Sequence, residues 1–386
     1  MCGEVAQFQA WRAVAPDDGG SRWVVVDADY VLHVEATAFL AGLRAADRSV
    51  NTERVYAGRV ALYLSYCAAR GIDWRRPNLL HLGDFLHWLT REPLPPKGCR
   101  PRAEPRFRSP GTANAVVTAV GEFLRFCTRH GWAPSEVAAQ LSQPKFLRYL
   151  PPGYDPGEDG QFRTVHTAAV RFRVAVEGYE WLAAEQVQQL IRFAGRARDR
   201  FLVALLGCAG MRIGEALGLR REDMHLLASS TSLGCRVAGP HVHVRRRQNA
   251  NGALAKTRSP RAIPVTVEVV DYYADYVHER DQVPQARSCD FVFVNLFRSP
   301  LGQPLRYGSA RDLFDRLAKR AGFPARPHML RHSAATAWIR AGVGRDVVQH
   351  LLGHVSPVSM EPYLHVSDAD KRAAVERVAA QRAGRG

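Results

Sequence analysis

The chain has 386 residues, of which 46% are hydrophobic and 23% are charged, as expected for a globular protein with more than one domain. Its 53 basic residues outnumber 37 acidic ones, so the formal net charge is +16. Such an excess attracts polyanions, most often nucleic acid, although a compositional bias alone would also produce it. No segment approaches the roughly 18 consecutive apolar residues of a membrane span, so we expect no membrane contact.

The cysteines indicate the cellular compartment in which the protein works. The seven cysteines are scattered along the chain and include no CxxC pair. The first residues lack the basic region and apolar run of a secretory signal peptide. We therefore predict a protein of the reducing cytoplasm rather than one held together by disulfides.

The N-terminal part of the chain reads as an extension followed by helices. Residues 1–35 have no assigned role and contain one short candidate strand, Trp23–Val26. Residues 36–150 are predicted to form an all-α domain, because apolar residues recur there at helical spacing. A loop rich in proline and arginine, 93–111, interrupts it and is either a DNA clamp or a solvated surface loop. The candidate helices cover 37–47, 53–71, 79–90 and 112–131.

A linker then leads into a larger domain. Residues 151–177 begin with a segment rich in proline and glycine and end with an alternating stretch, 170–176, that predicts an edge strand. Residues 178–386 are predicted to be mainly α with a small antiparallel sheet. Its strands lie within 239–265, around a turn at Asn251-Gly252.

Two cationic positions in this domain suggest phosphate chemistry. Arg212 stands at a turn that opens a short helix and is followed three residues later by Glu215. Its planar guanidinium can donate two parallel hydrogen bonds to a phosphate. Lys256 follows the predicted hairpin turn, although only five of the 53 basic residues are lysines. Because an ammonium can release a proton near neutral pH and a guanidinium cannot, Lys256 is a candidate proton donor.

The last third of the chain supplies the other polar candidates. His328 and Arg331 are three residues apart on one helix face, at a helix start marked by Pro327. His354 follows a helix that Gly353 ends, and Tyr363 comes nine residues later. A tyrosine is a weak nucleophile at its ordinary pKa of about 10, so it needs nearby cations and a base. The set predicts attack on a phosphodiester through a tyrosine.

Two histidine pairs are candidate metal ligands. His350 and His354 are four residues apart, and His241 and His243 point to one face of a strand. Neither pair has an evident further ligand in the sequence, so both predict packing rather than metal binding. We expect no metal and no cofactor.

Taken together, these motifs closely resemble those of the tyrosine recombinase (phage integrase) family. The matching segments are GMRIGEAL with Arg212 and Glu215, the hairpin Lys256, and HMLRH with His328 and Arg331. LLGH with His354 and YLHV with Tyr363 complete the set, although Pro362 departs from the usual residues before the nucleophile. The resemblance covers nearly all of residues 37–380.

The resemblance implies a fold and a reaction. The fold would be integrase-like, the DNA breaking-rejoining fold, with a SAM-like core-binding domain and a catalytic domain. Arg212, Arg331 and His354 would bind the scissile phosphate, with Glu215 in support. Tyr363 would attack to form a 3′-phosphotyrosyl bond, His328 would act as general base and Lys256 would protonate the 5′ hydroxyl. No metal ion is implied.

The resemblance also implies partners. These are double-stranded DNA sites and a tetramer assembled on them, with a possible accessory DNA-bending protein. Residues 368–384 form a tail that would pack either on a neighbouring protomer or on its own domain. Two alternatives remain at this point: a topoisomerase of type IB that relaxes DNA, and a relative that binds DNA without cutting it.

Overall fold

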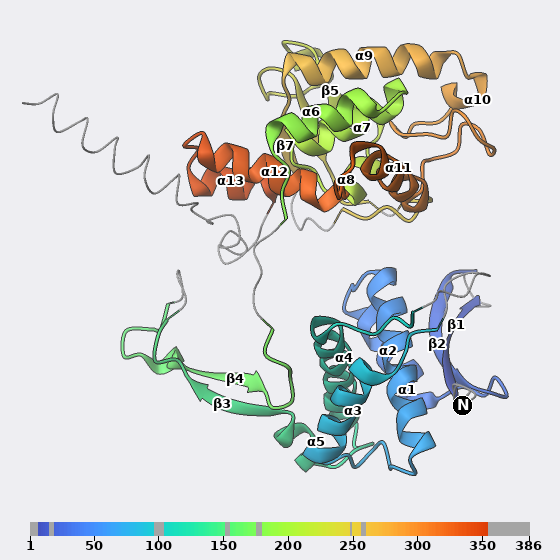
Figure 1. The fold of residues 1–386 in the computed structure, drawn as a ribbon, viewed down its shortest axis with the longest axis vertical. Coiled ribbons are helices and arrows are strands. Elements are labelled where there is room, and N and C mark those ends of the chain that lie inside the picture. The colour runs from blue at the N-terminus through green and yellow to red at the C-terminus, as the bar shows by residue number, and fades with distance from the viewer. Residues whose placement is uncertain are drawn as a thin grey trace, which may run out of the picture. The chain divides into compact units, whose positions relative to one another are not determined.

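The chain folds into two compact units that divide between Val176 and Glu177. Each unit has its own hydrophobic core, and Figure 1 shows the elements of both. In the parts that the structure describes, no helix is long and apolar enough to cross a membrane. The computed structural model describes residues 7–14, 19–95, 104–150, 155–174, 180–247, 249–255 and 260–353.

The first unit has a helical core, and all four predicted helices are confirmed. The second helix begins earlier than its pattern predicted, because Ser49 caps it by accepting a hydrogen bond from the Thr52 amide at 3.1 Å. The buried faces of the helices meet in one core that includes several aromatic rings. The helices are α1 (Val34–Ala45), α2 (Val50–Ala69), α3 (Leu79–Arg91), α4 (Pro110–Arg129) and α5 (Ser135–Gln140).

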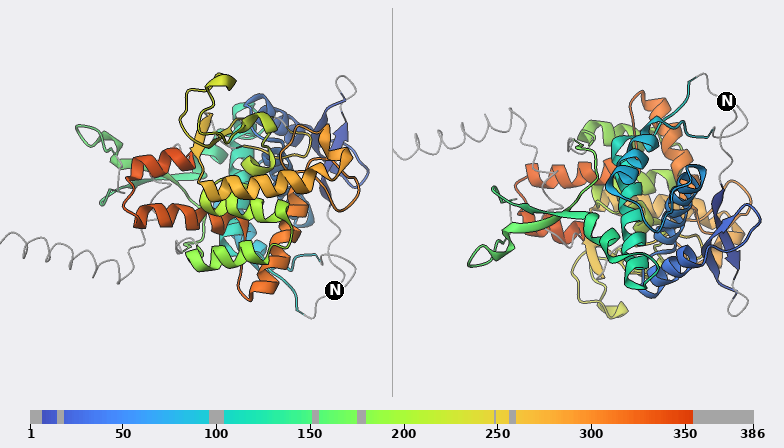
Figure 2. Two further views of the ribbon diagram at one scale, coloured as in Figure 1. Left: turned by 90° about the horizontal axis from the view of Figure 1, so that it is seen from above. Right: turned by 90° about the horizontal axis from the view of Figure 1, so that it is seen from below.

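Two antiparallel hairpins accompany this helical core, one in the N-terminal extension and one that runs from the end of the predicted helical domain into the predicted linker. One hairpin, β1 (Phe8–Val14) with β2 (Ser21–Asp27), contains the predicted strand near Trp23 and is bound to α2. Glu53 of α2 is buried and accepts a hydrogen bond from the Trp23 amide at 2.9 Å. The other hairpin, β3 (Ser142–Phe146) with β4 (Thr164–Ala168), extends away from the helices of this unit in both views of Figure 2.

The predicted edge strand at 170–176 is wrong for its described residues, 170–174, which form no strand. Asn114 of α4 explains this, because its side-chain amide bonds both backbone groups of Phe172. The amide donates to the Phe172 carbonyl at 3.0 Å and accepts from the Phe172 N–H at 2.8 Å. A side chain thus replaces the strand partner. Val170 and Phe172 pack against the helical core instead, with the Phe172 ring edge-on to that of His87.

The second unit is mainly helical around a small sheet, as predicted. Its central helix, α7, is buried from Phe201 to Leu206 and packs against α6, α9 and α12. The sheet has the antiparallel order β5–β6–β7. The strands are β5 (Met224–His225), β6 (His241–Val244) and β7 (Arg261–Pro264). The helices are α6 (Ala184–Phe193), α7 (Ala197–Cys208), α8 (Ile213–Leu217), α9 (Val267–Asp281), α10 (Pro284–Arg287), α11 (Tyr307–Ala321), α12 (Pro327–Arg340) and α13 (Arg345–Leu352).

A buried arginine ties the end of α9 to the segment that follows α10. Arg280 lies in the last turn of α9 and is 5% exposed. Its guanidinium donates to the carbonyls of Phe291 and Ala286 at 2.7 and 2.8 Å, and to those of Val292 and Cys289 at 3.0 and 2.5 Å. These four bonds compensate the desolvation of the charge and satisfy carbonyls that no sheet partner reaches.

The substitution Arg280→Leu should therefore destabilise the protein by about 3 kcal/mol, because it removes four hydrogen bonds to backbone carbonyls at once. Arg287→Leu is the control, since Arg287 is exposed and bonds one carbonyl at 3.1 Å. Its expected cost is below about 0.5 kcal/mol. Urea denaturation monitored by circular dichroism measures the free energy of unfolding of both variants. Equal losses of stability would contradict the structural role of Arg280.

Candidate active site

The candidate active site begins at the turn between α7 and α8. Arg212 is the N-cap of α8, and Glu215 lies in the first turn, where a carboxylate is favoured by the helix dipole. The Glu215 carboxylate accepts hydrogen bonds from the Arg212 amide and from its guanidinium, both at 2.9 Å. The predicted pairing of these two residues is thus a cap that fixes the arginine at the helix start.

Glu215 also binds two further arginines that are distant in sequence. Arg261 of β7 donates to its two oxygens at 2.8 and 3.3 Å. Arg331 of α12 lies 3.8 Å from the same carboxylate. The Glu215 side chain is fully buried, whereas the side chains of Arg212, Arg261 and Arg331 are 21%, 9% and 2% exposed. We call these four residues the arginine cluster.

The protonation of Glu215 follows from its partners. Burial raises the pKa of this carboxyl group, but the charge and hydrogen bonds of Arg261, with the charges of Arg212 and Arg331, outweigh it. The pKa of Glu215 therefore lies below its ordinary value. The carboxylate stays ionised near neutral pH and holds the three guanidinium groups in place.

The same arginines bond the C-terminal end of α13. Arg331 donates to the Leu352 carbonyl at 2.5 Å and to the Gly210 carbonyl at 2.8 Å, and Arg261 donates to the Leu351 carbonyl at 3.0 Å. Cations at this end of a helix are favoured by its dipole. Gly353 ends the helix with a φ of +63°, and a Cβ there would meet the Arg261 guanidinium at 2.8 Å. The cluster thus fixes the point from which the chain continues to His354.

The first two turns of α12 carry two histidines, His328 and His332. Pro327 begins the helix, as predicted, and His328 is exposed while Arg331 is buried one turn later. The rings of His328 and His332 stack with their centroids 5.9 Å apart. Burial, together with the charges of His328 and Arg331, lowers the pKa of His332 to about 4. His332 is therefore neutral at physiological pH.

Three predicted site residues, Lys256, His354 and Tyr363, lie outside the described residues. The segment that leads to Lys256 is nevertheless held against α8. Gly214 makes this possible, because a Cβ at that position would lie 2.6 Å from the Leu254 carbonyl oxygen. Ala255 is buried within the core of the same unit.

Sequence reasoning missed Arg261, which forms the strongest bonds to Glu215. It lies in the predicted hairpin, but nothing in its surroundings distinguishes it from the many other arginines of the chain. The feature of the sequence that could have identified Arg261 is its position at the start of the strand after the predicted hairpin turn.

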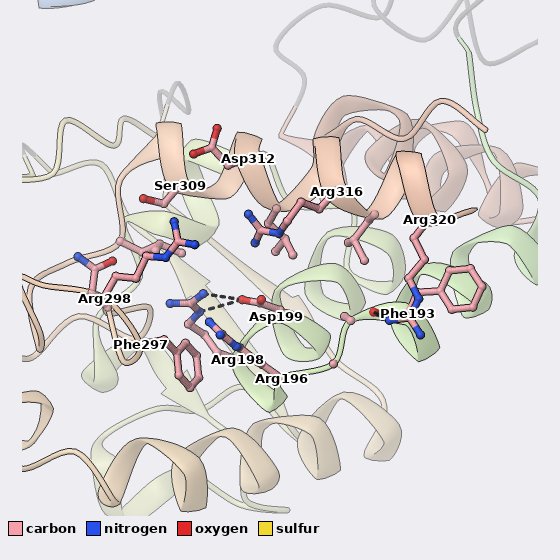
Figure 3. Close-up of a pocket in the computed structure, with 16 residues that line it drawn as sticks. Phe193, Arg196, Arg198, Asp199, Phe297, Arg298, Ser309, Asp312, Arg316 and Arg320 are labelled. Atoms are coloured by element: carbon pink, nitrogen blue, oxygen red, sulfur yellow. Dashed lines mark hydrogen bonds and ion pairs between the residues drawn. The ribbon is translucent and has the colours of Figure 1, made fainter. Parts of the chain in front are cut away.

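A separate basic pocket lies between α11 and the start of α7 (Figure 3). Arg198 there is paired with Asp199 at 2.7 Å, and the guanidinium of Arg196 lies 3.7 Å from the ring centroid of Phe297. Arg298, Arg316 and Arg320 also line the pocket, whereas no member of the arginine cluster does. Its lining is thus distinct from the candidate active site, and its charge suits an anion rather than an apolar ligand.

Comparisons with known proteins identify the family and the fold. Residues 180–370 match the model of the phage integrase family. Transposase A from transposon Tn554 of Staphylococcus aureus is 29% identical over 354 residues, which are 91% of this chain and 92% of that protein. Tyrosine recombinase XerC of Chlamydia trachomatis is 26% identical over 66% of this chain and 67% of its own. The structure of the Tn1549 transposon integrase in complex with circular intermediate DNA has a TM-score of 0.58 at 16% identity, covering 87% and 97% of the two chains.

The fold is therefore that of the integrase-type recombinases. The chain belongs to the phage integrase family, that is, to the tyrosine recombinases. It is an integrase- or transposase-type enzyme for DNA recombination, so the predicted family, fold class and activity are confirmed.

The arginine cluster predicts a large effect of Arg261→Ala. The substitution removes two hydrogen bonds to Glu215 and one to the Leu351 carbonyl, so the protein should lose about 3 kcal/mol of stability. The control is Arg311→Ala, because Arg311 and Asp315 form an exposed pair at 3.8 Å worth less than about 0.5 kcal/mol. Chemical denaturation compares the two. A loss as small as that of the control would show that Arg261 does not hold the cluster together.

The lowered pKa of His332 predicts a pH-dependent stability. In the unfolded chain His332 takes up a proton near its ordinary pKa of 6.5, whereas in the folded protein it does so only near pH 4. Stability is thus highest above pH 6.5 and falls as the pH drops from 6.5 towards 4. Between pH 7.5 and 5.0 the variant His332→Gln should lose less melting temperature than the wild type does. The control variant His350→Gln, changed at an exposed histidine, should lose as much as the wild type. An unchanged pH dependence in His332→Gln would contradict the shift.

Proposed function

We propose that this recombinase cuts and rejoins double-stranded DNA at specific sites through a 3′-phosphotyrosyl bond to Tyr363, and that it serves a mobile element. The observation that carries the mechanism is the arginine cluster, in which one buried carboxylate holds Arg212, Arg261 and Arg331 at the end of α13. Similarity to a transposase along 91% of the chain supports the mobile element.

The cluster suits the charge that develops on a phosphate under attack. Arg212 is the most exposed of the three guanidinium groups and contacts a non-bridging oxygen of the scissile phosphate directly. Arg331 is nearly buried, and it reaches the phosphate by exchanging its bond to the Leu352 carbonyl for one to a phosphate oxygen. Arg261 stays on Glu215 and positions the other two. His354, which follows α13 closely, donates a third hydrogen bond.

The bond changes balance without a further reactant. The Tyr363 oxygen forms a bond to phosphorus while the bond to the 5′ oxygen of the next nucleotide breaks. The tyrosine proton passes to His328 as general base, and Lys256 gives a proton to the leaving 5′ oxygen. Because the phosphodiester energy is kept in the tyrosyl bond, a 5′ hydroxyl from another strand can reverse the step.

In this proposal the two units have different functions. Residues 36–150, with the hairpin that precedes them, form the core-binding domain that clamps DNA. Residues 151–177 connect it to the catalytic domain, 178–386. The net charge of +16 supports binding to the DNA backbone. Exchange of strands proceeds in a tetramer on two DNA sites in the cytoplasm, with an accessory DNA-bending protein where a site requires one.

A suicide-substrate assay tests the nucleophile. Nicked DNA fragments from the region flanking the gene are mixed with the full chain in buffer without added divalent cations and resolved on a denaturing gel. The wild type should form a covalent protein–DNA band, because loss of the nicked fragment prevents religation. Tyr363→Phe should form none and should bind the same DNA within about twofold, since one hydroxyl changes.

Unchanged cleavage by Tyr363→Phe would show that another group is the nucleophile. Tight binding without any covalent band in the wild type would favour the relative that binds DNA without cutting it. Relaxation of supercoiled DNA that lacks any site would favour the topoisomerase alternative.

A further inference from the structure

Four potential metal ligands converge at one end of the small sheet, away from the arginine cluster. They are His225 of β5, His241 and His243 of β6, and Cys235 from the loop between these strands. One ligand atom from each lies within 4.8 Å of all the others. The sequence predicted that His241 and His243 share a face, but it gave them no further ligands. The structure supplies two.

The separations match a tetrahedral site. The Nε2 atoms of His241 and His243 are 3.1 Å apart, and the Cys235 sulfur lies 3.3 and 3.4 Å from them. Tetrahedral zinc, with bonds of about 2.05 Å to nitrogen and 2.3 Å to sulfur, would place two nitrogens about 3.3 Å apart and a nitrogen and a sulfur about 3.6 Å apart. The observed distances are slightly shorter, so binding needs only small adjustments.

Hydrogen bonds to two of the rings orient lone pairs for a metal. The Nδ1 of His241 is 2.7 Å from the Gly239 carbonyl, which can only accept, so this nitrogen carries the proton and Nε2 has the free lone pair. The Nε2 of His225 is likewise 3.2 Å from the Glu222 carbonyl. Such backbone bonds are usual for metal-bound histidines.

One polar atom in this cluster points to a missing partner. Among the described residues no group forms a hydrogen bond with the buried Nδ1 of His225, whose side chain belongs to a residue that is 6% exposed. Since Nε2 donates to a carbonyl, Nδ1 holds a lone pair, and leaving it buried and unpaired is unfavourable. A metal ion would satisfy it. The neighbouring Asp223 is bonded to Arg247 at 2.6 Å, so it is engaged elsewhere.

We propose that His225, Cys235, His241 and His243 bind one Zn²⁺ ion in a structural site. Three imidazoles and a thiolate suit this metal, and four protein ligands leave no open position for catalysis. His225 and His241 are buried, while Cys235 and His243 are partly exposed, so the ion enters from the solvent side.

The ion would stabilise a loop that lacks a hydrophobic core. The loop between β5 and β6 exposes Leu227 and Leu233, at 65% and 61%. A bond from Cys235 through the ion to both strands closes this loop on the sheet, which lowers the entropy of the open chain. The site shares no residue with the proposed chemistry, and its test is independent of DNA cleavage.

Cobalt(II) is the probe, because it replaces zinc and reports its ligands by absorption. The full chain, freed of metal by chelation, is titrated with Co²⁺ alone and then with Zn²⁺. The wild type should bind one Co²⁺ per chain, with the intense visible bands of tetrahedral geometry and a near-ultraviolet thiolate-to-metal band. Added Zn²⁺ should abolish both features. Metal analysis of protein purified without chelator should give one zinc per chain.

Matched variants identify the ligands. Cys235→Ser should lose the thiolate band, and His243→Asn should weaken Zn²⁺ binding by more than about 100-fold, beyond the effect of losing an outer hydrogen bond. Cys289→Ser and His350→Asn should behave as the wild type. Circular dichroism checks that each variant is folded.

Wild-type protein that binds no Co²⁺ in tetrahedral geometry would overturn the proposal, whatever the variants do. So would a thiolate band that survives in Cys235→Ser. If a ligand variant fails to fold, the wild-type spectrum and stoichiometry still decide the matter.

Discussion

The buried carboxylate of Glu215 is the interaction on which the second unit depends. Three guanidinium groups from α8, β7 and α12 would repel one another at such short range, and a single buried charge holds them together. Desolvation of four charges is costly, and it is offset here by hydrogen bonds to the carboxylate and to backbone carbonyls. Elements far apart in sequence therefore meet at one point, and that point is where the proposed reaction needs positive charge.

The arginine cluster also links the binding of a phosphate to the end of α13. Arg331 bonds the Leu352 carbonyl, two residues before His354. If a phosphate takes over this guanidinium, as the proposed mechanism requires, the last turn of α13 loses one cationic partner and keeps the hydrogen bonds that Arg261 donates to Leu351 and Arg212 donates to Leu352. Substrate binding in the proposed mechanism would thus redistribute the hydrogen bonds at the end of α13.

The sequence predicted what local patterns encode. The helices of the first unit and the start of α12 at Pro327 follow from spacing and turn chemistry, and the family motifs identified the activity. It failed where a contact is long-range. Arg261 is one arginine among many, and the strand predicted at 170–176 is replaced by the side chain of Asn114, 58 residues away from Phe172.

The small sheet shows how two such long-range sites share one element. Val244 pairs with Arg261 and His243 with Ala262, so two of the proposed zinc ligands, His241 and His243, lie on the strand that pairs with Arg261. A strand of four residues with one short partner on each side is weak by itself. An ion fastened to β5, β6 and their loop would restrict this strand, and through its register would restrict Arg261. A metal ion that takes no part in the reaction would then still contribute to the geometry of the proposed active site, in which arginines bind the phosphate.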